Sequence, residues 1–437
     1  RYWRDWSSDV CSSDLVSMTA RDAAFQALLR VERDDAYLNL LLPSILRNIE
    51  SSRDRRLVTE LSYGTARWQG SYDAILASLS SKPIDEIDDE VLISLRLGCH
   101  QILKMRIPTH AAVSEMVDLI KHHHGVGASK YVNAILRKVS QKDFQQWITE
   151  LSRGLNEIES LCIEYSHPKW IIEEFAKLIP PDELKDLLIR NNEPAAINIA
   201  VRPGRVSHDF STDANAAKDL RTKYGYRWNG QIDAIPNLND GNVGIQDIGS
   251  QLVVEHFFDA PISTEETFWV DLCAGPGGKM ALLEAVGSLS NVEVWGSEIS
   301  PHRCELVRNL LRNPDRVLNI DGRQWSKEGA SRILVDAPCS GLGAIRRRPE
   351  SRWRKSPASL QELNLLQTEL LQRAVEVCTS GGVIGYSTCS PIQSETDMII
   401  KNILATQPVK LQKVYRYWPH IDDTDGMYLA ILEKAAN

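Results

Sequence analysis

The chain has 437 residues, enough for about three domains. Apolar residues make up 43% and charged residues 25% of it, close to globular averages, and no run approaches the roughly 18 uncharged apolar residues of a membrane span. The formal net charge of −8 excludes a polycation that coats nucleic acid indiscriminately. We therefore expect a soluble multidomain protein in which any nucleic-acid site is local.

The eight cysteines are sparse, and none is spaced as CxxC or CxxxxC. This spacing argues against a structural zinc site. Sparse cysteines without a recognisable signal peptide are typical of the reducing cytoplasm. We therefore predict free thiols, a cytoplasmic location and no metal.

Residues 1–17 differ from the sequence that follows. RYWRDWSSDVCSSDL has no apolar run and no helical period, and Met18 is the first plausible start. We interpret residues 1–17 as foreign, because they resemble a translated cloning adapter. The alternative is a disordered native arm with aromatic anchors.

Residues 18–145 show a helical pattern throughout. Apolar residues recur at steps of three and four, and Ser80 to Pro83 and Ile107-Pro108 separate the helices. The pattern predicts an all-α bundle. The run His122 to His124 precedes Gly125, which indicates a helix end rather than a metal site.

Two long segments of this bundle are similar to a NusB-type RNA-binding domain. They read RDRRLVTELSYGTARWQGSYDAIL and VLISLRLGCHQILKMRIPTHAAVSEMVDLIK. The resemblance implies contact with RNA. Phosphate contacts can come from Arg53, Arg55, Arg56 and Arg67, and the alternative is a solvated helix face.

The rest of the chain divides at about residue 240. Residues 146–240 mix helical pieces with the strand-like PAAINIAVRPG, which predicts a small α+β connecting module. In residues 241–437, short apolar runs alternate with helical segments. The runs are Phe268–Leu272, Val292–Gly296, Arg332–Val335 and Gly382–Tyr386. This alternation predicts a doubly wound, Rossmann-like α/β domain, whose ligands bind at the carboxyl ends of the strands.

A glycine-rich turn, CAGPGGK, joins the first of these strands to a helix. It matches neither GxxxxGK[ST] nor GxGxxG. The next strand ends at Glu298, whose carboxylate can accept both ribose hydroxyls, and Asp321 closes a third strand and can hold the adenine amine. A nucleoside held without a phosphate cradle points to S-adenosylmethionine (SAM). The alternative is a tight turn with ordinary capping acids.

Two cysteines follow neighbouring strands of the predicted sheet. Asp336 ends the fourth strand before Pro338-Cys339, and Cys389 ends the fifth. The two cysteines should face one pocket, because parallel strands end at the same edge. An enzyme that methylates an exocyclic amine usually has [DNS]PP[YFW] after the fourth strand, so cysteine favours methylation at carbon. The alternative, a small buried hydrophobic residue, suits Cys99, Cys162, Cys304 and Cys378 better.

The motifs DLCAGPGGK, DAPCSG and STCS, with QDIGSQLV and the NusB-like helices, resemble the RsmB/Sun (Fmu) family. This family comprises bacterial small-subunit rRNA cytosine-5 methyltransferases, and the resemblance covers residues 18–437. It implies a SAM site made by Cys273, Ala274, Gly275, Pro276, Gly277, Gly278, Lys279, Glu298, Asp321 and Asp336. It also implies that Cys389 is the nucleophile that adds to C6 of a cytosine in 16S rRNA, and that Cys339 assists product release.

Two further residues are expected to take part in the reaction. Asp336 can support N3 and the exocyclic amine of the base as charge develops there. Lys279 can supply the positive charge that favours a thiolate. The chain departs from the common family loop CAAPGGKT at Gly275 and Met280, it has Glu298 where aspartate is frequent, and SPIQSE follows Cys389.

A basic stretch follows the DAPCSG motif. It contains Arg346, Arg347, Arg348, Arg352, Arg354 and Lys355. We expect it to clamp phosphates beside a flipped cytosine, and the alternative is a solvated charge run.

RNA is favoured over DNA as the substrate, because DNA cytosine-5 methyltransferases place their nucleophile in the Pro-Cys motif. The alternative substrates are a tRNA or another site in rRNA, and the alternative function is that of a non-catalytic assembly factor. We expect the protein to be a monomer.

Overall fold

The computed structural model describes residues 18–435, so the predicted foreign segment 1–17 lies outside the described residues. The chain forms two compact units. The first extends to Glu193 and also contains Ile345–Arg354, and the second contains Pro194–Ala344 and the chain from Lys355 onward. In the described part of the chain, no helix is long and apolar enough to span a membrane.

The first unit is all helical. The sequence predicts this for residues 18–145, but it assigns the helices of residues 146–193 to the connecting module. Local signals start its helices: Thr19 and Asp22 form a capping box at α1, and Asp88 caps α5. The helices are α1 (Ala20–Arg33), α2 (Leu38–Arg47), α3 (Ser52–Arg67), α4 (Gln69–Leu79), α5 (Asp89–Leu103), α6 (Thr109–Val139), α7 (Phe144–Leu151), α8 (Glu157–Tyr165), α9 (Lys169–Ala176), α10 (Pro181–Asn191) and α14 (Ser351–Arg354). Phe25, Tyr72 and Met116 are fully buried in its core.

The histidine run lies inside α6. Gly125, the residue after it, has a φ of 86° and interrupts the helical backbone. Glycine accepts this left-handed conformation without steric cost. The helix end that the sequence predicts at this point is therefore present as a break between two helical stretches.

A small sheet opens the second unit. Its strands are β1 (Asn198–Val201), β2 (Ala216–Lys218), β3 (Gly225–Trp228) and β4 (Val243–Ile245). They are antiparallel in the order β2-β3-β1-β4. Ile199, Phe210 and Trp228 form a core of their own beneath this sheet.

The main sheet has seven strands in the order β10-β11-β9-β8-β5-β6-β7. The strands are β5 (Phe268–Asp271), β6 (Glu293–Ser297), β7 (Val317–Leu318), β8 (Ala330–Asp336), β9 (Cys378–Thr388), β10 (Val409–Tyr417) and β11 (Met427–Lys434). The five strands from β9 to β7 run parallel, whereas β11 and β10 are antiparallel additions at one edge. The sheet is therefore mixed, and it contains the five strands that the sequence predicts, β5 to β9.

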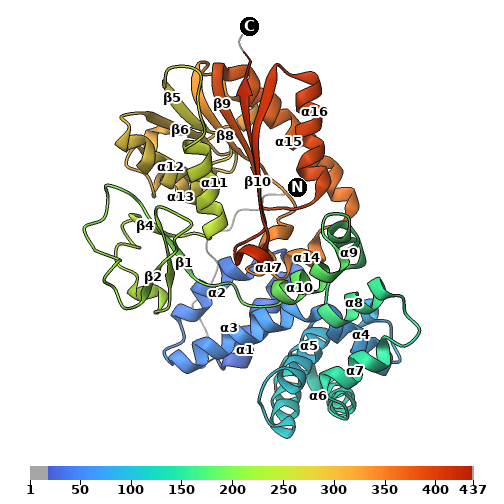
Figure 1. Ribbon diagram of the computed structural model, residues 1–437. Coiled ribbons are helices and arrows are strands. Elements are labelled where there is room, and N and C mark those ends of the chain that lie inside the picture. Colours follow the sequence, from blue (N-terminus) through green and yellow to red (C-terminus); the bar gives the residue numbers. More distant parts are fainter. Residues whose placement is uncertain (1–17, 436–437) are drawn as a thin grey trace. The chain divides into compact units, whose positions relative to one another are not determined.

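Helices cover both faces of this sheet (Figure 1). Neighbouring residues of a strand point to opposite faces, so Trp269 packs in one core cluster and Val270 in the other. The first cluster includes α11 (Ile248–Phe258), α12 (Gly278–Leu289) and α13 (Pro301–Arg308), and the second includes α15 (Pro357–Val377) and α16 (Asp397–Thr406). This three-layer arrangement confirms the predicted α/β domain.

Candidate active site

The carboxyl ends of four parallel strands define the candidate site. From β5 the chain crosses first to β6 on one side and then, past β7, to β8 on the other side. The reversal of strand order between β5 and β8 is the position at which open α/β sheets bind ligands. Asp271, Glu298, Asp336 and Cys389 lie at or directly after the ends of β5, β6, β8 and β9.

The predicted cofactor loop, Cys273 to Lys279, connects β5 to α12. Its first part is tied to strand-end carboxylates, because Cys273 N–H donates to Asp271 Oδ1 at 3.1 Å and Gly275 N–H donates to Glu298 Oε2 at 3.1 Å. Gly277 has a φ of 111° at the N-cap of α12, a conformation that favours glycine. The N-terminus of α12 therefore begins at the same edge of the sheet as the strand-end carboxylates.

The structure places the other two predicted nucleoside ligands at neighbouring strand ends. Glu298 is buried, accepts a hydrogen bond from Ser300 N–H at 2.9 Å and forms an ion pair with Arg303 at 3.3 Å. Asp321 forms an ion pair with Arg323 at 2.6 Å, and its hydrogen bonds from the Arg323 side chain hold the pKa of the carboxyl below its usual value. Both side chains thus accept hydrogen bonds at strand ends.

Sequence reasoning missed Asp271. This residue is 1% exposed, and its Oδ2 has no hydrogen-bond partner. Burial, reinforced by the nearby Asp336 carboxylate, raises the pKa of Asp271 to about 7. The signal was available, because an aspartate ends the apolar strand FWVD and a buried carboxylate with an orphaned oxygen indicates a function.

We expect Asp271→Asn to stabilise the protein at pH 8 but to have little effect at low pH. Between pH 3.8 and 7 the folded state keeps a proton that the unfolded state releases, so the wild type loses stability as the pH rises through this window. The variant loses none from this position, so its advantage over the wild type should grow by about 3 kcal/mol between pH 5 and pH 8. Urea unfolding of both proteins at pH 5 and pH 8 measures the difference. An equal effect at the two pH values would contradict the buried, unpaired carboxylate.

Lys279 and Asp336 form an ion pair at the centre of the site. Lys279 Nζ lies 2.9 Å from Asp336 Oδ2, and Ser387 Oγ donates to Asp336 Oδ1 at 2.7 Å. Burial alone would lower the pKa of Lys279, but the Asp336 carboxylate outweighs it and raises that pKa. Lys279 therefore carries a fixed positive charge, and the Asp336 carboxylate is oriented from two sides.

The structure brings the two predicted cysteines together. Cys339 Sγ and Cys389 Sγ are 3.4 Å apart. The hydrogen bond with Cys389, with burial second, raises the pKa of the Cys339 thiol well above its usual value. Cys339 thus keeps its proton, and its thiol lies within hydrogen-bond reach of the sulfur of Cys389. Cys99, Cys304 and Cys378 are buried elsewhere, Cys162 is partly buried, and all seven cysteines of the described chain are free thiols.

Two glycines fix the backbone behind Cys389. Gly343 N–H donates to the Cys389 carbonyl at 2.9 Å, and Gly426 N–H donates to the Gly343 carbonyl at 2.8 Å. A Cβ on Gly343 would lie 1.9 Å from the Gly426 carbonyl oxygen, so this close backbone approach requires glycine.

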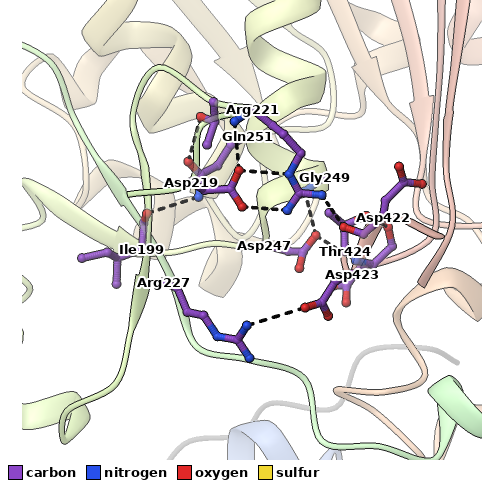
Figure 2. A network of polar contacts seen from close by, with 12 residues as sticks. Ile199, Asp219, Arg221, Arg227, Asp247, Gly249, Gln251, Asp422, Asp423 and Thr424 are labelled. Carbon is purple, nitrogen blue, oxygen red and sulfur yellow. Dashed lines mark hydrogen bonds and ion pairs between the residues drawn. The ribbon is translucent and has the colours of Figure 1, made fainter. Parts of the chain in front are cut away.

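A polar network supports the segment that ends at Gly426 (Figure 2). Asp247 Oδ1 accepts from Gly249 N–H at 2.8 Å and from Asp425 N–H at 2.9 Å. Arg221 donates to the Asp422 carbonyl while it also pairs with Asp219. The small sheet and the start of α11 therefore support, through Gly426 and Gly343, the loop that carries Cys389.

The basic stretch after DAPCSG lies mainly in the helical unit, which corrects part of the predicted phosphate clamp. Arg346 and Arg352 are buried. Arg354 donates to the carbonyls of Val31 and Asp35 at 2.8 and 2.7 Å. Arg352 likewise donates to the Ser166 and Asn191 carbonyls. The guanidinium groups of Arg352 and Arg354 thus bind protein carbonyls instead of phosphate, and burial keeps Arg346 from the surface. Phosphate contact stays a prediction for Arg347 and Lys355, which are partly exposed, and for the exposed Arg348.

Arg67 needs the same correction. It ends α3 and is 5% exposed, and burial lowers the pKa of its guanidinium. A group that is buried in the folded protein does not offer its charge to RNA at the surface. Arg53 and Arg56 are exposed and Arg55 is partly exposed, so phosphate contact stays a prediction for these three residues.

Comparisons with known proteins agree with this architecture. Residues 261–433 match the family model of 16S rRNA methyltransferase RsmB/F, and residues 18–141 match the NusB family. A putative methyltransferase of Mycobacterium tuberculosis (strain H37Rv) is 37% identical over 95% of this chain and 96% of its own length. Ribosomal RNA small subunit methyltransferase B of Pseudomonas putida is 30% identical over 90% of both chains.

The overall fold also matches a solved structure. The crystal structure of PH0851 superposes with a TM-score of 0.80 at 23% identity and covers 95% of this chain and 98% of that one. The helical domain and the mixed sheet thus occur together in a solved fold. The chain therefore belongs to the RsmB/F family of methyltransferases and carries a NusB-family domain at its N-terminal side, as the sequence predicts.

Proposed function

We propose that this protein methylates C5 of a cytosine in 16S rRNA, with SAM as the methyl donor and Cys389 as the covalent nucleophile. The observation that carries the proposal is the pair of thiols, 3.4 Å apart, beside the Lys279–Asp336 ion pair. A thiol that adds to a ring carbon makes the neighbouring carbon nucleophilic. The ribosomal substrate is supported by the named activity of the Pseudomonas putida relative.

The strand-end carboxylates fit SAM. Asp271 has an unpaired buried oxygen, which suits an ammonium group. Glu298 can accept the ribose hydroxyls and Asp321 the adenine amine, and the Cys273 to Lys279 loop offers backbone contacts without a phosphate cradle. When bound, SAM supplies an electrophilic methyl group on a sulfonium. The donor set of this chain therefore matches the parts of the molecule that need recognition.

In the first half of the reaction, Cys389 attacks the base. Its thiolate sulfur forms a bond to C6 of the cytosine, and the electrons of the C5=C6 bond become available at C5. Lys279, which stays protonated, stabilises the thiolate before the attack. Asp336, held by Lys279 and Ser387, can support N3 and the exocyclic amine as charge develops there.

In the second half, Cys389 leaves. The methylated C5 loses its proton to a base, the electrons of the C–H bond re-form C5=C6, and the electrons of the C6–S bond return to Cys389. The Cys339 thiol, 3.4 Å from that sulfur, can donate a hydrogen bond that stabilises the departing thiolate. Without this donor the covalent protein–RNA adduct should persist.

The test is methyl transfer from labelled SAM to deproteinised small-subunit rRNA that lacks its native methylation. Bisulfite sequencing of the product should show one newly protected cytosine. A parallel reaction with tRNA distinguishes the substrate, and a Cys339→Ala protein should leave a covalent adduct on a denaturing gel. RNA binding without methylation of either RNA would overturn the proposal.

A further inference from the structure

Glu395 is a buried carboxylate beside the two cysteines. It is fully buried at the end of a short 3-10 turn, Gln393–Glu395, six residues after Cys389. No lysine, arginine or histidine forms an ion pair with it in the described chain. Burying a carboxyl group away from water is costly unless its hydrogen bonds compensate. Its hydrogen bonds therefore indicate what the residue holds in place.

Both carboxylate oxygens of Glu395 accept hydrogen bonds from Ser340, the residue that follows Cys339. Glu395 Oε1 accepts from Ser340 N–H at 2.8 Å, and Oε2 accepts from Ser340 Oγ at 2.5 Å. On the other side of Cys339, Gln367 Nε2 donates to the Pro338 carbonyl at 2.9 Å and to Glu395 Oε1 at 3.1 Å. Glu395 and Gln367, which are hydrogen-bonded to each other, thus fix the backbone on both sides of Cys339.

The same network reaches the loop of Cys389. Ser340 Oγ lies 3.0 Å from Ser390 Oγ, so the residues that follow the two cysteines contact each other. Tyr386 OH, on β9, donates to the Glu395 carbonyl at 2.8 Å and fixes the position of this turn. A change at position 395 would therefore alter the relative placement of the two thiols.

We propose that Glu395 is a positioning residue for product release, and that through Ser340 it holds the Cys339 thiol against the sulfur of Cys389. The inference rests on the proposed function, because it assigns Glu395 to the release half of that reaction. Cys389 has an additional support that does not involve the Glu395 side chain, through Gly343 and the end of β9. Loss of Glu395 should consequently slow release more than it slows the first attack.

The test measures the covalent protein–RNA adduct during turnover. We expect Glu395→Ala to raise the steady-state adduct fraction and to lower kcat by about tenfold or more, because a shift of about 1 Å in a reacting group has effects of this size. The rate of adduct formation in a single turnover should stay close to that of the wild type. A fall in both rates with no accumulation would overturn the inference.

Glu395→Gln tests whether the hydrogen bonds carry the effect. Its amide oxygen can accept from Ser340 N–H and Gln367, and its amide nitrogen can donate to Ser340 Oγ, whose own proton then turns toward Ser390 Oγ. This variant should release product within about twofold of the wild type, since the connection to Ser340 survives. An adduct level as high as that of Glu395→Ala would overturn positioning through Ser340.

Glu255→Ala is the matched control for lost stability. Glu255 is 5% exposed and, like Glu395, accepts from a backbone N–H and a hydroxyl, those of Lys223 and Thr222. It contacts neither cysteine loop, so its loss should lower the unfolding midpoint without raising the adduct fraction. Adduct accumulation in this control would overturn the inference, because general destabilisation would then account for the effect.

Cys339→Ala separates the inference from the proposed function. If Cys339→Ala accumulates no adduct, the proposed release role of Cys339 is wrong and the role of Glu395 falls with it. If Cys339→Ala accumulates adduct and Glu395→Ala does not, only the inference about Glu395 is wrong. Accumulation in both variants, with release preserved in Glu395→Gln, supports both.

Discussion

Cys389→Ala is expected to abolish methyl transfer, with a loss of about 10,000-fold or more in kcat, because removal of a covalent nucleophile eliminates the reaction path. Cys389 lies at the end of β9, 3.4 Å from Cys339 and near the charged Lys279. The remaining thiol sits on another loop and keeps its proton, so it does not substitute. Labelled methyl transfer to unmethylated small-subunit rRNA measures the loss.

Cys389→Ser serves as the companion variant. A hydroxyl fills nearly the same volume, but it is far more basic than a thiol and does not add to C6, so this variant should be equally inactive. Both variants should bind SAM with unchanged affinity, measured by calorimetry, because no residue of the proposed cofactor set has been altered. Methylation that survives in either variant would exclude Cys389 as the nucleophile.

The site was predictable where the chemistry follows the ends of parallel strands. Cys339 and Cys389 are 50 residues apart in the chain, but each follows a strand of one parallel sheet, and such strands end at the same edge. The same rule predicted that Glu298 and Asp336 lie at the ligand-binding edge of the sheet. Asp271 also ends a parallel strand, but the sequence analysis considered the glycine turn after it and not the strand end itself.

Two departures from the family loop are explained together by the structure. A Cβ on Gly275 would lie 2.0 Å from Glu298 Oε2. The longer glutamate thus occupies the space that the methyl group of an alanine needs, and glycine at 275 makes that space available. Neither departure was interpretable alone, because the sequence does not reveal that positions 275 and 298 are in contact.

The basic stretch after the DAPCSG motif is a part of the chain whose contacts could not be predicted from the sequence. Its charge pattern predicted phosphate contacts, but Arg352 is hydrogen-bonded to Ser166, Asn191 and Asn192, which are 160 or more residues away in the chain. Local composition carries no information about such partners. The edge strands β10 and β11 were missed for a related reason, since pairing at the edge depends on contacts distant in sequence.

Arg352→Met is expected to destabilise the helical unit by about 3 to 5 kcal/mol. Arg352 is fully buried, and its guanidinium donates to the Ser166 carbonyl and to Asn192 Oδ1, both at 2.9 Å, and to the Asn191 carbonyl at 3.2 Å. Methionine fills part of the volume but leaves these three acceptors without a donor. Removal of a buried charge offsets part of the loss, which sets the lower end of the range.

Arg348→Ala is the matched control, because it lies in the same Ile345–Arg354 segment but is exposed. Its contact with the Tyr37 ring, 5.6 Å from the guanidinium, is worth about 1 kcal/mol or less. Arg352→Lys should not restore stability, since one ammonium does not reproduce the fork of donors that reaches three acceptors. Urea unfolding gives the free energies, and hydrogen exchange should increase over α8 to α10 in Arg352→Met but not in Arg348→Ala. Equal unfolding midpoints for these two variants would show that Arg352 does not anchor the segment that follows the Cys339 loop. Contact of Arg352 with an RNA phosphate would then again be a candidate role.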